Sequence, residues 1–251
     1  MNDWRARIQQ LGPASKVALA LGVVLLIALV VLGGIYALGT LFFYDSYSSS
    51  YEYDVSISID GETEDAVFIV PIGVHDGEAH LGDVHFSESD RFDGIDYTVA
   101  DTEHGPMLRI EVDEIREAPD WHHLEFTAQV ESDRTIDTRS PRGTEPLLSP
   151  VERFVRDLDE PHHDRWPDYR NFDATSTAYI EHDGDEDVEI GVSVWYRGGN
   201  DWWTFGWNGN WYETAVLANE AAHDPNGVWI ELTGWHTEGA GSYPTFPPAP
   251  S

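Results

Sequence analysis

The chain of 251 residues contains no cysteine and a single lysine, Lys16. Without cysteine it can form no disulfide bond, no thiolate metal ligand and no cysteine nucleophile. It also lacks the G-x-S-x-G, Walker, Rossmann and H-E-x-x-H motifs of several common enzyme classes. No catalytic residue can therefore be picked out, and we expect a protein without a cofactor whose role is non-enzymatic.

Positive charge is scarce, because 14 Lys and Arg stand against 46 Asp and Glu, for a net charge of -32. Such a chain repels itself in dilute buffer, whereas at molar salt the Debye length falls to about 3 Å and screens the repulsion. A surface rich in Asp and nearly free of Lys resembles proteins of extreme halophiles, which implies an environment rather than an activity. A cation-binding or repulsive acidic protein is the alternative. The charge excludes nucleic acid as a partner.

A long uncharged segment, Val17 to Phe43, predicts a single-pass transmembrane helix over residues 17–44. The run is too long for a cleaved signal peptide. Arg5, Arg7 and Lys16 precede it, and no base follows until Arg91, so residues 1–16 should be cytoplasmic and the bulk of the chain extracellular at the cell membrane. Aromatic residues at the outer end predict an interfacial belt, formed by Tyr36, Phe42, Phe43, Tyr44 and Tyr47. Residues 45–50 read as a polar stalk.

Apolar and polar residues alternate from Tyr51 to Ile59, which is typical of a half-buried strand. Residues 66–70 form a continuous apolar run, which Pro71 should end, and alternation returns at 108–112 and at 124–130. Together these segments define a first β region over residues 45–132. The chain should therefore form a mainly β, antiparallel, sandwich-like ectodomain, as one or two β subdomains.

A polar connection over residues 133–175 should contain one short helix. Ser149-Pro150-Val151-Glu152 matches a capping box with proline at the first helical position, and apolar residues follow at helical spacing to Leu158.

A β meander is expected over residues 176–238, with strands at 177–181, 188–196, 202–207, 211–217 and 228–235. Turns are predicted at 183–187, at 198–201 and at Asn208-Gly209, a typical hairpin dipeptide. Residues 213–223 could instead be helical. The proline-rich tail, residues 239–251, should be disordered.

Aromatic residues crowd the middle of this meander, and the candidate binding residues are Trp202, Trp203, Trp207 and Trp211. In an extended strand Trp203, Phe205 and Trp207 share one face. We expect that face to lie in the core, which leaves Trp202 as the exposed aromatic. An exposed set could instead stack on sugars.

The sequence leaves metal binding undecided. There are eleven histidines, but neither the pairs His122-His123 and His162-His163 nor the stretch from His75 to His80 has helix-borne ligand spacing. Asp183, Asp185 and Asp187 lack the glycine and the later glutamate of a calcium loop, so an acidic turn is the better interpretation.

These observations suggest a membrane-anchored extracellular acidic protein of a halophile. Its role would be structural or interactive at the cell surface, with other surface proteins or glycans as partners. A carbohydrate-binding or glycoside-cleaving ectodomain using the tryptophans is one alternative, and a pilin-like filament subunit is another.

Overall fold

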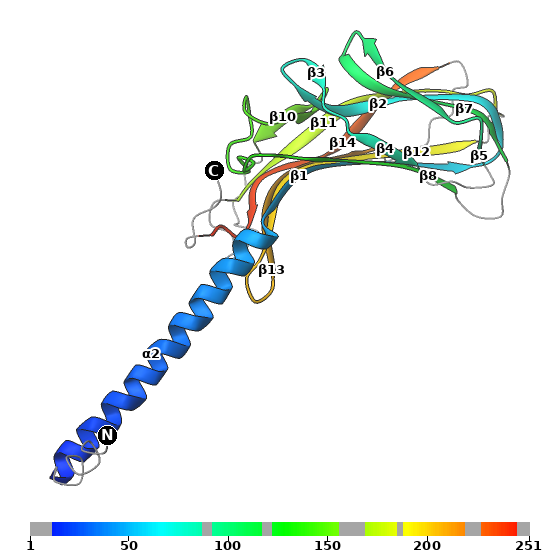
Figure 1. Ribbon diagram of the computed structural model, residues 1–251. Coiled ribbons are helices and arrows are strands. Elements are labelled where there is room, and N and C mark those ends of the chain that lie inside the picture. Colours follow the sequence, from blue (N-terminus) through cyan, green and yellow to red (C-terminus); the bar gives the residue numbers. More distant parts are fainter. Residues whose placement is uncertain are drawn as a thin grey trace.

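A computed structural model describes residues 12–86, 92–116, 122–155, 169–184, 188–218 and 227–244. Within these residues the protein has one helix, α2 (Pro13–Ser46), followed by antiparallel strands only, so the predicted mainly β class is confirmed (Figure 1). The strands are β1 (Ser48–Asp60), β2 (Thr63–His75), β3 (Glu78–Ala79), β4 (Asp83–Phe86), β5 (Phe92–Asp93), β6 (Asp96–Thr102), β7 (Gly105–Ile115), β8 (His122–Glu131), β9 (Leu147–Ser149), β10 (Glu152–Val155), β11 (Arg170–Glu181), β12 (Glu189–Trp203), β13 (Trp207–Leu217) and β14 (Val228–Gly241).

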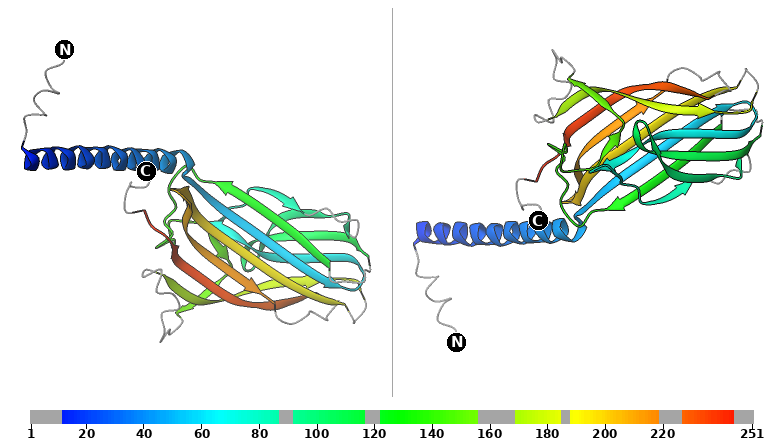
Figure 2. Two further views of the ribbon diagram at one scale, coloured as in Figure 1. Left: turned by 90° about the horizontal axis from the view of Figure 1, so that it is seen from below. Right: turned by 90° about the horizontal axis from the view of Figure 1, so that it is seen from above.

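All the described strands belong to one curled sheet (Figure 2). Their order in the sheet is β4-β8-β1-β12-β13-β14-β11-β2-β7-β5, and the short strands β3, β6, β9 and β10 are attached to it. β1 lies between β8 and β12, where Val55 pairs with Phe126 on one side and with Val194 on the other. The first β region and the meander are thus hydrogen-bonded into a single sheet rather than two subdomains.

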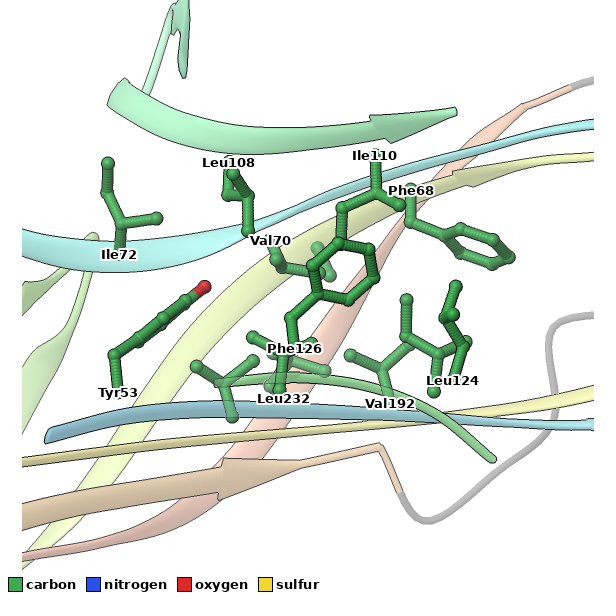
Figure 3. Close-up of a cluster of buried hydrophobic side chains, with 14 of the residues drawn as sticks. Tyr53, Phe68, Val70, Ile72, Leu108, Ile110, Leu124, Phe126, Val192 and Leu232 are labelled. Carbon is green, nitrogen blue, oxygen red and sulfur yellow. The ribbon is translucent and has the colours of Figure 1, made fainter. Parts of the chain in front are cut away.

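The core lies inside the curl of this sheet. Alternate residues of β1 from Tyr51 to Ile59 are all buried, as their period-2 pattern predicts. They meet Phe68 and Val70 of β2, Ile110 of β7 and Phe126 of β8 (Figure 3). Burying each such side chain stabilises the fold by about 1.5–3 kcal/mol. Both halves of the sheet contribute, so neither has a complete core of its own.

β2 does not end at Pro71, as the sequence suggested, but continues to His75. On one edge Pro71 pairs with Met107 of β7. On the other edge β11 pairs with residues 67–69 and β9 with residues 72–74, so Pro71 lies in the gap between them. Its carbonyl oxygen accepts a hydrogen bond from the Tyr53 hydroxyl at 2.8 Å. Proline is tolerated because no strand needs an N–H at this point.

The helix predicted from Ser149 onward is wrong for the residues that the structure describes. Leu147–Ser149 is β9, and Glu152–Val155 is β10. β9 pairs with β2 and β10 pairs with β11, and the Ser176 hydroxyl donates to the carbonyl of Pro150 between them. These long-range pairings outweigh a local capping signal. Residues 156–168 of the prediction lie outside the described residues.

α2 starts before the predicted span and extends beyond it, from Pro13 to Ser46. Within the described chain it is the one helix long and apolar enough to cross a membrane, and the sheet covers none of its most apolar stretch. The expected stalk is absent, because residues 45 and 46 are helical and only Tyr47 separates α2 from β1. Near the C-terminus, β14 runs through Gly241, into the predicted disordered tail. Residues 245–251 lie outside the described residues.

Candidate functional site

An aromatic junction joins the end of α2 to the sheet. We define the helix junction as Phe42, Phe43, Ser46, Tyr47, Trp202 and Trp203. Phe43 is fully buried and meets the Trp202 ring edge-on at 5.9 Å. The Tyr47 ring stacks on Trp202, 6.0 Å from its ring and nearly parallel to it, and lies 5.4 Å from the Phe43 ring. Large rings in contact contribute both buried area and favourable ring geometry, so α2 is packed onto the sheet.

Polar contacts complete the helix junction. The backbone N–H of Trp203 donates to Oγ of Ser46 at 2.7 Å, and the Ser46 hydroxyl donates to the Phe42 carbonyl at 2.6 Å. The Trp203 ring meets Phe42 edge-on at 5.0 Å. The last turn of α2 is therefore joined to β12 by hydrogen bonds as well as by packing, and its direction relative to the sheet is set by side chains on both sides.

The β12–β13 hairpin extends past this junction along α2 (Figure 1). Its tip, residues Trp203 to Trp207, is closed by the pairing of Trp203 with Trp207 and by a hydrogen bond from the Thr204 N–H to the Gly206 carbonyl at 2.9 Å. Phe205 has a φ of 57° and leans on the helix, where a Cβ atom at Gly39 would lie 2.9 Å from its ring. Phe205 is 61% exposed and Trp207 is 74% exposed.

The predicted faces of the aromatic residues are inverted. Trp202 is buried, at 4% exposure, whereas Phe205 and Trp207 are exposed. The error comes from the turn expected at 198–201. β12 instead runs without interruption from Glu189 to Trp203, so the inward alternation of Val194 and Tyr196 continues through Asn200 to Trp202. Asn208-Gly209 likewise lies inside β13, opposite Trp202 and Asp201.

The four candidate tryptophans do not converge on one surface. Trp202 and Trp203 belong to the helix junction, and Trp207 lies at the hairpin tip. Trp211 lies farther along β13, where the Arg197 guanidinium sits 5.1 Å from the centre of its ring. Arg197 also pairs with Glu52 at 3.4 Å. The four rings therefore do not form one surface on which a sugar could stack.

A cavity of about 450 Å³ opens beside the helix junction. Asn200 and Asn210 form its floor, and its rim includes Tyr47, Arg139 and Tyr243. The floor is tightly hydrogen-bonded, because Oδ1 of Asn210 accepts from the Asn200 amide at 2.9 Å and from the Thr138 hydroxyl at 2.8 Å. The Arg139 guanidinium lies 3.9 Å from the centre of the Tyr243 ring. These groups are already paired with one another, which favours a structural role for the floor.

Two buried carboxylates anchor the connection between β8 and β9. Glu145 receives a bidentate pair from Arg134 at 2.9 and 3.0 Å and a hydrogen bond from the Tyr51 hydroxyl at 2.5 Å. Burial and the hydrogen bond to this carboxylate raise the pKa of Tyr51 above its ordinary value. Such paired ions hold a loop in place, since breaking one leaves an unpaired buried charge.

The second carboxylate, Glu238 in β14, binds Arg170 at 2.7 Å and Arg142 at 3.3 Å. His236 lies 3.3 Å from Glu238 through Nε2, and its Nδ1 lies 2.7 Å from the Thr214 hydroxyl. Burial lowers the pKa of His236. Burial alone would raise the pKa of Glu238, but His236 and the two arginines together lower it. Sequence reasoning missed both clusters; the one local signal was the concentration of arginines between 134 and 142.

A second cavity, of about 320 Å³, is lined by Glu62, Glu64, Glu114, Asp183 and Arg116, among others. Across the parts of the chain that the structure describes, no group of three or more His, Asp or Glu side chains is placed to hold a metal ion. Asp185, Asp187, His162 and His163 lie outside those parts.

Comparison with known proteins adds no relative, since no family model, no curated protein and no solved structure matches this chain.

Proposed function

We propose that this chain is a membrane-anchored cell-surface protein of a high-salt environment, with a structural or interactive role in the envelope. One observation carries the proposal: an apolar helix with exposed side chains passes into β1 across a single residue, Tyr47, and is packed onto the sheet at the helix junction. A domain attached in this way is held against the membrane surface and does not range away from it on a tether. That arrangement suits a fixed element of the envelope.

The paired state of the ionisable groups supports a non-enzymatic role. Glu145 and Glu238 are each 2% exposed and bound to arginine, and His236 is fully buried between Thr214 and Glu238. Catalytic acids and bases must reach a substrate within hydrogen-bonding distance. These three groups instead reach only other parts of the chain, so we assign them to the stability of the domain.

The glycoside-cleaving alternative required tryptophans lining a cleft beside two carboxylates. Trp202 is buried under α2, and none of the four candidate tryptophans lines either of the two cavities described above. This placement favours the structural role over sugar cleavage.

The absence of cysteine allows a direct test of location. Single-cysteine variants Ser15→Cys, before the apolar run, and Glu103→Cys, in the turn between β6 and β7, are treated in intact cells with a membrane-impermeant maleimide. We expect Glu103→Cys to be labelled at once and Ser15→Cys only after permeabilisation, with both in the membrane fraction. The reverse labelling would overturn the topology, and recovery of the full chain in the soluble fraction would overturn the anchor.

A further inference from the structure

We infer that the β12–β13 hairpin tip, residues Trp203 to Trp207, is a second membrane contact, which inserts Phe205 and Trp207 into the lipid headgroup interface beside α2. The inference rests on the proposed function, because it needs α2 to span a bilayer. It adds that the folded domain itself touches lipid, so that the protein meets the membrane through two elements remote in sequence.

Exposure singles out the tip. Outside α2, Trp207 and Phe205 are the two most exposed large apolar side chains among the described residues, at 74% and 61%. Single exposed apolar residues are ordinary on protein surfaces. Two large exposed rings on one tight turn, of which Phe205 lies against an apolar helix, are not ordinary. Exposed aromatic residues next to a membrane segment mark an interfacial contact.

The depth of the tip fits the interface. The Phe205 ring lies against Gly39, seven residues before the last residue of α2, which corresponds to about 10 Å along the helix axis. A hydrocarbon core of about 30 Å takes up roughly 20 of the 34 residues of α2. When that core is centred on the uncharged run from Val17 to Tyr44, Gly39 falls near its outer boundary. Indole and phenyl rings prefer this level of a bilayer.

The hairpin tip and the residues that flank it carry no charged side chain. No charged residue occurs from Trp202 to Tyr212, between Asp201 and Glu213, although the chain carries 46 acidic residues. A hairpin tip surrounded by brine would be expected to share the acidity of the remaining surface. A tip surrounded by headgroups must avoid it, because each buried carboxylate would carry a large desolvation cost.

The hairpin tip is also ordered without any contact with lipid. Its backbone is closed by the Thr204–Gly206 hydrogen bond, the Trp203 ring lies 5.9 Å from that of Phe205, and Trp203 is held by Phe42 and Ser46. Phe205 adopts a left-handed backbone conformation that few bulky residues take up. A wedge that is already ordered loses little conformational entropy on insertion.

A bilayer suits this surface better than a second copy of the chain. A stable protein interface takes roughly 800 Å² from each partner, whereas the tip offers two rings. Lipid already surrounds the neighbouring face of α2 in the proposed arrangement, so the contact with the tip is continuous with it. Self-association through the tip is therefore an outcome for the experiment to detect.

Depth-dependent fluorescence quenching tests the inference on the full chain. Four single-cysteine variants, Thr204→Cys and Trp207→Cys at the tip, Leu26→Cys in α2 and Val99→Cys on β6, are labelled with an environment-sensitive dye. Thr204→Cys keeps both exposed rings. Each variant is reconstituted at molar salt in phosphatidylcholine–phosphatidylglycerol vesicles that carry nitroxide either near the headgroup or deep in the acyl chain. Circular dichroism checks that each variant is folded.

We expect headgroup nitroxide to reduce the fluorescence of both tip labels by roughly twofold or more, as an interfacial position requires, and deep nitroxide to quench Leu26→Cys most. Val99→Cys should be unaffected. Quenching at Leu26→Cys without quenching at either tip label would overturn this inference and leave the proposed anchor intact. Loss of quenching at all sites would overturn the anchor as well. Quenching of the tip that requires high protein density, with cross-linking between tip cysteines, would assign the tip to self-association.

Discussion

The side-chain amide of Asn200 donates a hydrogen bond to Oδ1 of Asn210 at 2.9 Å, across the β12–β13 pair in which the two residues face each other. The same amide donates to the Ile136 carbonyl, and its Oδ1 accepts from the Ile136 N–H and the Ser49 hydroxyl. One buried asparagine thus joins β1, the hairpin and the connection after β8, all beside the helix junction.

Replacing Asn200 by alanine should lower the free energy of unfolding by about 2–4 kcal/mol, because the Ile136 N–H and C=O and the Ser49 hydroxyl lose a partner in a buried position. Asn208→Ala is the matched control, since its side chain makes one local bond, to the Gly206 carbonyl. Urea unfolding of the full chain at molar salt measures both. Equal losses in the two variants would contradict the structural role assigned to Asn200.

The place of Asn200 also shows where sequence reasoning failed. Alternation along β1 and β7 predicts their buried faces, because side chains of a strand lie on two faces with period two. Glycine and asparagine near 198–201 read as a turn, yet a Cβ atom at Gly198 would lie 2.5 Å from the Tyr212 ring. Glycine is needed there to admit a ring from the neighbouring strand, a long-range requirement that local propensity does not reveal.

In the aromatic stretch of the meander, the predicted inward and outward faces are exchanged. A misplaced turn shifts the alternation by one residue and exchanges every side chain between faces. The packing of Phe43 and Tyr47 onto Trp202 joins residues more than 150 positions apart, and no spacing rule anticipates it. The ion pairs of Glu238 depend on the same kind of tertiary placement.

Trp202→Ala should destabilise the protein by about 3–5 kcal/mol, the range for large aromatic residues removed from a packed core. Trp207→Ala, in the same hairpin, should change the free energy of unfolding by no more than about 0.5 kcal/mol in detergent, because its ring is exposed. Thermal unfolding in detergent at molar salt compares the two. A larger effect at Trp207 than at Trp202 would contradict the burial of the helix junction.

Salt should be required for folding, because the chain carries a net charge of -32. The Debye length is about 3 Å in molar salt, which screens the repulsion between acidic groups, and about 30 Å in dilute buffer, which leaves most of that repulsion in place. The β signal in circular dichroism of the full chain should be present in molar potassium chloride and decline on dialysis. Sucrose at matched osmolality is the control, because it stabilises compact states by exclusion without screening charge. An undiminished β signal in dilute buffer would contradict the high-salt part of the proposed function.

Stability should fall as the pH falls, through His236 and Glu238. Burial lowers the pKa of His236 below its ordinary value of 6.5. The unfolded chain then takes up a proton before the folded chain does, so folding loses free energy below pH 6.5 until the folded pKa is reached. The pKa of Glu238 is lowered below 4.5, so its contribution is present above that pH and is lost at lower pH, as its folded pKa is passed.

The His236→Gln variant separates these two windows. It should make the free energy of unfolding less dependent on pH below pH 6.5, because one of the groups whose pKa is lowered by burial has been removed. Thr214→Val is the matched control: it removes the hydrogen bond to Nδ1 but keeps the buried imidazole, so stability should drop while the pH slope persists. Urea unfolding at several pH values and constant molar salt gives both slopes. If His236→Gln retained the slope of the unmodified chain, the titrating group would have to lie elsewhere, since fixed salt holds the screening of the acidic surface constant.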